Sequence, residues 1–101
     1  MILPRTVSDQ QRRELGAFAR YCAQRIERDV GVQDQWRISL IMAEDETFTS
    51  VASVQHHGER IATEGCGVGT DPALTIWNAM CRLEHAIVAV LPSMRYRKMF
   101  A

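Results

Sequence analysis

The sequence predicts an α+β fold, a two-layer sandwich with the element order α-β-β-β-α, in which two helices cover one face of a three-stranded antiparallel sheet. Three observations support it. Apolar residues recur every three or four positions in the first and last thirds of the chain, as in amphipathic helices. Between them, apolar and polar residues alternate, as in strands with one buried face. Short acidic or glycine-containing stretches separate the alternating segments, so consecutive strands are expected to turn back on each other.

The 101 residues are expected to form one domain, with residues 1–7 as an N-terminal arm and residues 92–101 as a basic C-terminal tail. Hydrophobic residues make up 47% and charged residues 24%, which is ordinary globular composition and argues against disorder. The 12 basic and 12 acidic residues cancel, so no overall field draws the protein to nucleic acid or to an anionic membrane.

The chain shows no sign of membrane insertion or secretion. No apolar run approaches the roughly 20 residues of a membrane span, and the first residues lack the order of a signal peptide. The three cysteines are odd in number and have no C-x-x-C spacing, which favours reduced thiols. We therefore expect a cytoplasmic protein.

The first helix is predicted to begin after Ser8, which together with Gln11 has the spacing of a capping box. Gly31 is a natural stop for this helix, because glycine takes the left-handed conformation at little cost. The apolar stripe of the helix consists of Leu15, Phe18, Cys22, Ile26 and Val30.

The central segment predicts a strand over 35–43, an acidic turn over 44–46 and a hairpin around His57-Gly58. A two-residue hairpin loop fixes which residues lie opposite each other. The expected pairs are Gln55–Arg60, Val54–Ile61, Ala52–Thr63 and Val51–Glu64. This register places apolar residues on one face of the sheet and polar residues on the other, as in a sheet that is covered on one side.

The second helix is predicted to begin at Pro72, capped by Asp71, and to end at Pro92. Its main apolar stripe is Ile76, Met80, Leu83, Ile87 and Val90. A second apolar stripe is Leu74, Trp77, Cys81 and Val88. The remaining polar seam is narrow and consists of Thr75, Asn78, Arg82 and His85.

The stretch EGCGVGTD, residues 64–71, resembles a phosphate-binding loop, because glycines lead into a helix start. It lacks the G-x-G-x-x-G spacing of a dinucleotide fingerprint and the Lys-Ser/Thr of a P-loop, and Asp71 occupies the place of the anion. Glycines two apart also match strand geometry, with Gly65 and Gly67 on the inner face beside a bulky residue such as Trp36 or Trp77. We expect this structural role and no bound cofactor.

Metal binding and catalysis have little support in the sequence. Cys81 and His85 are four residues apart on a helix and could share an ion, with His56, His57 or Cys66 as further ligands. No paired metal motif accompanies them, and buried free cysteines are common. No catalytic constellation is visible, so we predict a protein that is not an enzyme and has no catalytic residue; a zinc site around Cys81 and His85 stays as an alternative.

Nucleic-acid binding is a further alternative. The element order is that of double-stranded-RNA-binding domains, but the start of the second helix lacks the lysines with which those domains contact phosphates. The residues that could contact a nucleic-acid backbone are the arginines of the first helix and Arg95, Arg97 and Lys98 of the tail.

Protein binding is the favoured interpretation, because the second helix has more apolar surface than one sheet face can cover. Apolar and aromatic residues on an exposed face mark interfaces, and a homodimer is a simple way to bury them. The interface residues expected on this basis are Leu74, Trp77, Cys81 and Val88. The first helix could cover the same face, and the sequence leaves both possibilities open.

Residues 56–87, HHGERIATEGCGVGTDPALTIWNAMCRLEHAI, combine a short hairpin with a helix that begins at Asp-Pro. In this they resemble small accessory proteins encoded by phages and prophages. The resemblance implies a non-catalytic protein that binds and modulates a host or phage partner, for example as an inhibitor of a host protein. It assigns no role to any single residue.

Overall fold

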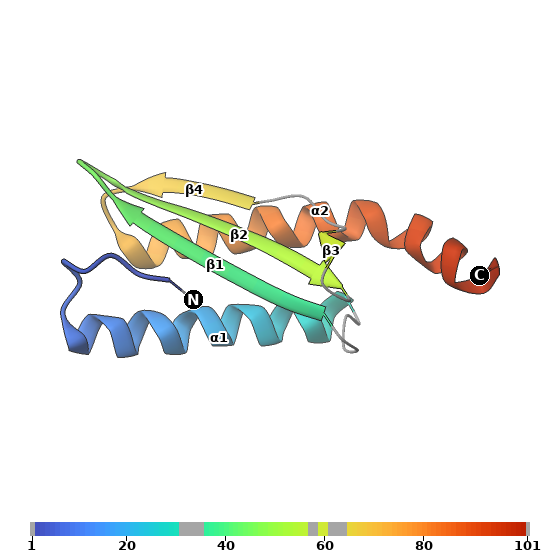
Figure 1. The fold of residues 1–101 in the computed structure, drawn as a ribbon, viewed down its shortest axis with the longest axis horizontal. Coiled ribbons are helices and arrows are strands. Elements are labelled where there is room, and N and C mark those ends of the chain that lie inside the picture. The colour runs from blue at the N-terminus through green and yellow to red at the C-terminus, as the bar shows by residue number, and fades with distance from the viewer. Residues whose placement is uncertain (1, 31–35, 57–58, 61–64, 101) are drawn as a thin grey trace.

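A computed structural model describes residues 2–30, 36–56, 59–60 and 65–100 and confirms the α+β fold (Figure 1). The elements are α1 (Asp9–Val30), β1 (Trp36–Glu44), β2 (Phe48–His56), β3 (Glu59–Arg60), β4 (Gly65–Gly69) and α2 (Pro72–Phe100). The third predicted strand is present as two pieces, β3 and β4, which both pair with β2. The order α-β-β-β-α is therefore the order that the sequence predicts.

The sheet is antiparallel, with β2 in the centre, β1 along one side of it and β3 and β4 along the other. Both helices lie on one face of the sheet and run side by side in the same direction (Figure 1). Of the two, α2 packs against β4 and β2, and α1 packs against α2. This arrangement leaves the opposite face of the sheet uncovered by either helix.

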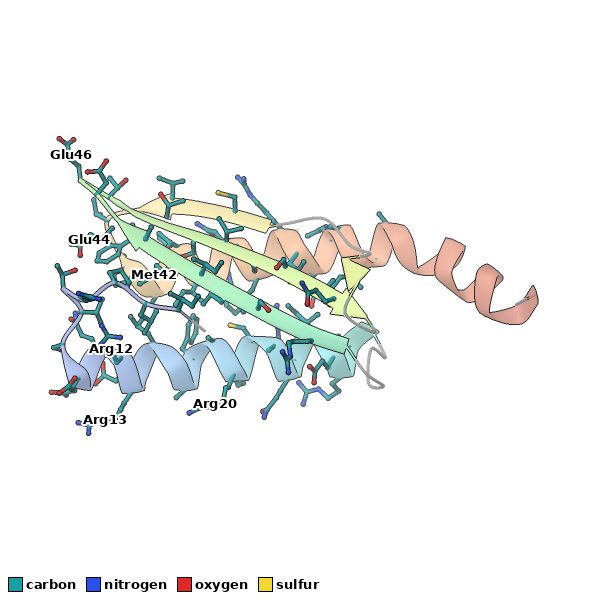
Figure 2. All side chains as sticks on the ribbon, viewed as in Figure 1. Arg12, Arg13, Arg20, Met42, Glu44 and Glu46 are labelled. Atoms are coloured by element: carbon teal, nitrogen blue, oxygen red, sulfur yellow. The ribbon has the colours of Figure 1, made fainter. Side chains whose placement is uncertain are left out.

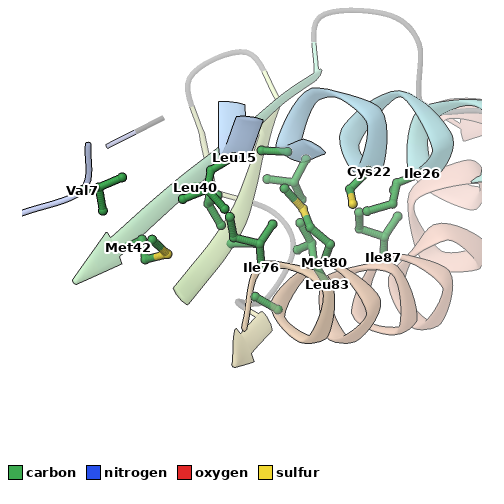
Figure 3. Packing of buried hydrophobic residues seen from close by; sticks show 14 residues of the cluster. Val7, Leu15, Cys22, Ile26, Leu40, Met42, Ile76, Met80, Leu83 and Ile87 are labelled. Carbon is green, nitrogen blue, oxygen red and sulfur yellow. The ribbon is translucent and has the colours of Figure 1, made fainter. Parts of the chain in front are cut away.

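The core lies between the inner face of the sheet and the two helices (Figure 3). Its buried apolar members are Val7, Leu15, Ala19, Cys22, Ile26, Leu40, Met42, Ala52, Val54, Ile76, Ala79, Met80, Leu83 and Ile87. Most members of the predicted α1 stripe and of the main α2 stripe are among them, which confirms the 3.6-residue period as the signal for both helices.

The predicted start of α1 is confirmed. The Gln11 N–H donates a hydrogen bond to Ser8 Oγ at 3.2 Å, and the Ser8 N–H donates to Gln11 Oε1 at 3.2 Å. These reciprocal bonds form the capping box, in which each side chain accepts from an N–H that the helix leaves free. Gly31, the predicted stop, lies outside the described residues.

The hairpin register is confirmed at its closed end and wrong farther along. Gln55 pairs with Arg60, as predicted. Ala52 pairs with Gly65 instead of Thr63, and Val51 pairs with Cys66 instead of Glu64. The register thus shifts by two residues between β3 and β4. Residues 61–64, which include the predicted partner of Val54, lie outside the described residues. Because the shift is even, every β4 side chain stays on its predicted face.

The predicted start of α2 is also confirmed. The Ala73 N–H donates a hydrogen bond to Asp71 Oδ1 at 3.0 Å, and Pro72 is the first helical residue. The predicted end at Pro92 is wrong, because α2 continues to Phe100. Proline removes one backbone hydrogen bond of a helix and crowds the preceding turn, so it weakens or kinks the helix at that point. The helix can still continue beyond the proline, as α2 does here. The basic residues of 92–100 therefore belong to the same helix as the core residues.

The N-terminal arm lies along the outer edge of β1. The Ile2 N–H donates a hydrogen bond to the Leu40 carbonyl at 2.9 Å, and the Met42 N–H donates to the Ile2 carbonyl at 2.9 Å. Farther along the arm, Val7 is buried in the core. The arm thus covers part of a strand edge that would otherwise present free backbone groups.

Candidate protein-binding surface

The glycine-rich strand β4 packs its backbone directly against the backbone of α2. A Cβ atom added at Gly65 would overlap the Ala79 carbonyl and lie 2.6 Å from the Leu83 nitrogen. One added at Gly67 would overlap the Thr75 carbonyl. The structural role predicted for these glycines is therefore present, with the neighbour corrected from a tryptophan such as Trp77 to the helix backbone.

The start of α2 offers little to a phosphate. The carboxylate of Asp71 accepts hydrogen bonds from the Ala73 and Leu74 N–H groups, at 3.0 and 3.4 Å. These are the donors that a bound anion would need, and the carboxylate would also repel it.

The interface predicted on α2 is divided by α1. Trp77 is half-buried because the Phe18 ring lies 6.3 Å from its ring, centroid to centroid. Cys81 is half-buried as well, whereas Leu74 and Val88 are 54% and 53% exposed. The four residues therefore do not form one open stripe, and α1 covers the middle of it.

A charged pair lies at the edge of this helix contact. The Arg25 guanidinium lies 3.7 Å from Glu84 Oε2 and 4.7 Å from the centre of the Trp77 ring. Arg25 Nε and Glu84 Oε2 are buried and have no hydrogen-bond partner among the described residues. The ion pair and the cation–π contact fix how α1 and α2 lie against each other.

The polar seam predicted on α2 is partly wrong, because Thr75 is fully buried. Thr75 Oγ1 lies 2.6 Å from Ser50 Oγ, and it donates to the Pro72 carbonyl at 2.8 Å. A buried hydroxyl is tolerated when it is hydrogen-bonded, and Ser50 provides that partner from β2. Arg82 and His85 are exposed, as predicted.

The outer face of the sheet carries an apolar row that crosses four segments of the chain. Ile2 pairs with Ile41, Ile41 pairs with Val51, and Val51 pairs with Cys66. Paired residues point to the same face of a sheet, and this row points away from the helices. Ile2 is 61% exposed and Ile41 is 51% exposed, while Val51 and Cys66 in the middle are half-buried.

A second row beside it extends the apolar area. Ala43 pairs with Thr49, and Thr49 pairs with Val68, which is 61% exposed. Toward the other end of the sheet, the outward residues of β1 and β2 become polar. These are Arg37, Ser39, Ser53 and Gln55. We call Ile2, Ile41, Val51, Cys66 and Val68 the outer sheet patch.

Sequence reasoning missed the outer sheet patch, although part of its signal was present. Ile41 interrupts the polar positions of β1, and Val51 does the same in β2. Seen one strand at a time, each is a single exposed apolar residue, which is ordinary on a protein surface. Only the pairing of the arm with β1 and of β2 with β4 brings them into one row.

The residues weighed for metal binding do not come together. Among the residues that the structure describes, no three histidine, cysteine or acidic side chains are grouped as metal ligands. Cys66 points outward from the sheet, on the face away from the helices, whereas Cys81 and His85 belong to α2. His57 and the side chain of His56 lie outside the description.

The residues of the nucleic-acid alternative lie on two separate helices. Arg13 and Arg20 point away from the sheet (Figure 2). Arg12 instead donates a hydrogen bond to the Pro4 carbonyl at 2.7 Å. Three further basic residues, Arg95, Arg97 and Lys98, lie in the last turns of α2, which extend past the sheet (Figure 1).

Comparison with protein-family models, with curated proteins and with solved structures finds no match to this chain. Within the described parts of the chain, neither helix combines the length and the apolar character needed to cross a membrane.

Proposed function

We propose that the protein is a non-enzymatic binding protein whose contact surface is the outer sheet patch. The observation that carries this proposal is the cross-strand row Ile2–Ile41–Val51–Cys66, which faces away from both helices. Contiguous apolar side chains on an exposed face are characteristic of protein-binding sites. The resemblance to phage accessory proteins, which implies a role in binding and no catalysis, supports the same interpretation.

The partner that we propose for this patch is a second copy of the chain. In a twofold dimer the same patch meets itself, so an apolar row needs no complementary partner sequence. The 12 basic and 12 acidic residues cancel, so two copies do not repel each other through their net charge. A chain of 101 residues also has a small core, to which buried subunit contacts add stability.

The test is the mass of the protein in solution, measured by sedimentation equilibrium over a wide concentration range. The unmodified protein is expected to be a dimer, and Ile41→Glu is expected to weaken dimerisation at least tenfold, because it places a charge in the contact. Since Ile41 is already half-exposed, this substitution should leave the fold intact, which circular dichroism checks.

The matched control is Ser39→Glu, which introduces the same charge on the same strand and face, two residues away from the patch. It should change the dimer constant far less than Ile41→Glu. A protein that stays monomeric at its highest attainable concentration overturns the homodimer. Equal effects of the two substitutions overturn the placement of the contact on the outer sheet patch.

A further inference from the structure

Two contacts between α1 and α2 share one offset in residue number, and the long Arg25 side chain also reaches back one layer to Trp77. Phe18 packs on Trp77, and Arg25 pairs with Glu84, so the residue numbers differ by 59 in both contacts. The helices run in the same direction (Figure 1). A constant offset is what two parallel helices require when matching positions face each other at every layer.

Cys22 and Cys81 fall into this pattern. Cys22 lies on α1 between Phe18 and Arg25, with the spacing of four and three residues that keeps side chains on one stripe. Cys81 lies on α2 between Trp77 and Glu84 with the same spacing. Their numbers also differ by 59, so the two cysteines occupy one layer of the helix contact.

Electrostatics supports the same placement. Burial raises the pKa of the Cys22 thiol above its ordinary value of 9.0. The Arg25 guanidinium acts in the opposite direction, and the neighbouring Cys81 thiol raises the Cys22 pKa further. Cys81 is thus among the groups that act electrostatically on Cys22, together with Arg25 of the same helix contact.

We infer that Cys22 and Cys81 form a redox-active dithiol, which closes to an intramolecular disulfide between α1 and α2 when the protein meets a peroxide. Helices in contact have axes about 8–10 Å apart and backbone radii of about 2.3 Å, so facing Cα atoms are on the order of 5 Å apart. A disulfide spans a Cα separation of about 4.4–6.8 Å.

The two cysteines have different roles in this step. Cys81 is half-buried and Cys22 is fully buried, so the peroxide reaches Cys81 first. The Cys81 thiolate attacks one peroxide oxygen, the O–O bond breaks, and Cys81 becomes a sulfenic acid while one water leaves. The Cys22 sulfur then attacks the Cys81 sulfur, the S–O bond breaks and a second water leaves. In total, two thiols lose two electrons and two protons, and one peroxide is reduced to two waters.

Cys66 makes a matched control, because it lies on the outer face of the sheet, away from Cys22. Trypsin leaves Cys66 and Cys81 on one peptide, residues 61–82, and places Cys22 on residues 21–25. The experiment therefore uses Cys66→Ser, in which any link between these two peptides involves Cys81.

Purified Cys66→Ser protein is treated with hydrogen peroxide at low protein concentration, unfolded, alkylated, digested and mapped by mass spectrometry. The expected result is a monomer that has lost two hydrogens, no longer reacts with the alkylating agent and contains the linked peptides 21–25 and 61–82. A thiol reductant should restore both free thiols. The variant Cys66→Ser/Cys81→Ser should give no linked peptide.

Two results would overturn the inference. One is the recovery of both thiols, alkylated or oxidised to separate acids, after peroxide treatment of the folded protein. The other is a link that occurs only between two chains, recognised by the mass of a covalent dimer. The mapping is done on Cys66→Ser, which retains Cys22 and Cys81, after circular dichroism has shown that this variant is folded. Neither result depends on whether Cys66→Ser/Cys81→Ser folds.

Discussion

Ser50 and Thr75 are the two polar side chains that lie fully buried in the described part of the core. Thr75 Oγ1 has one proton, which it donates to the Pro72 carbonyl at 2.8 Å. Either hydroxyl could donate in the 2.6 Å contact between them, and with the Thr75 proton on the Pro72 carbonyl the donor is Ser50. The pair is therefore directional: Ser50 depends on Thr75 for its acceptor, while Thr75 keeps a second partner.

This direction predicts that Thr75→Val destabilises the protein more than Ser50→Ala. Valine leaves the buried Ser50 O–H without an acceptor, at a cost of about 2 kcal/mol, whereas alanine at position 50 leaves Thr75 bonded to Pro72, at a cost of about 1 kcal/mol. Urea unfolding measures both free energies. In the double variant no hydroxyl is left unpaired, so the total cost should be less than the sum of the two single costs. Strict additivity would contradict the pairing.

Because of Cys22, the free energy of unfolding is expected to depend on pH in the alkaline range. Because burial raises the pKa of this thiol above 9.0, the folded protein keeps a proton that the unfolded chain releases. The stabilising contribution is complete below pH 9.0 and is lost as the pH rises from there through the pKa of the folded state. The free energy of unfolding should fall over that range by up to about 1.4 kcal/mol per pH unit.

The measurement is urea unfolding at several pH values on both sides of 9.0, for the unmodified protein and for Cys22→Ala. The variant removes the thiol, so its unfolding free energy should fall less steeply in this range, whatever its overall loss of stability. Parallel curves for the two proteins would show that the proton on Cys22 contributes nothing.

At the scale of elements, the contact between β4 and α2 requires glycine at two positions of β4, because there is no room for a side chain there. Gly65 and Gly67 face the carbonyls of Ala79 and Thr75 so closely that any Cβ atom would overlap backbone. Backbone cannot move aside as a flexible side chain can, so the strand and the helix would have to separate. A Cβ atom added at Gly69, on the same strand and the same face, would lie 3.5 Å from a methyl group of Thr75, which is ordinary contact.

We therefore predict that Gly65→Ala and Gly67→Ala each lower the free energy of unfolding by about 3 kcal/mol, as overpacked core positions do. Gly69→Ala, the matched control, should change it by less than about 1 kcal/mol, because its added methyl finds room. Thermal or urea unfolding compares the three variants. Similar losses at all three positions would mean that glycine is needed in β4 for its backbone freedom and not for the close approach of α2.

At the scale of the whole molecule, local signals predicted the fold well. The capping pair Ser8–Gln11 and the Asp71-Pro72 helix start depend on residues next to each other in the chain, and both are present. The alternation of inward and outward residues depends only on a period of two, so a register shift of two residues leaves it unchanged. No local sequence signal predicted that shift.

Features that depend on distant segments were not predictable in this way. Thr75 was expected on the polar seam of α2. Its burial in the core depends on a hydrogen bond with Ser50, which lies 25 residues away in sequence. The outer sheet patch requires the arm, β1, β2 and β4 to be placed side by side. The contact of Phe18 and Arg25 of α1 with Trp77, which divides the interface predicted on α2, likewise joins segments far apart in the sequence.

The parallel docking of α1 on α2 also has a consequence for synthesis. On the ribosome, α1 emerges with its apolar stripe well before the segment that covers it, because matching positions are 59 residues apart. At about 5–20 residues per second, the stripe stays uncovered for roughly 3–12 seconds. Throughout that interval the nascent chain exposes an apolar helix face that the finished protein buries.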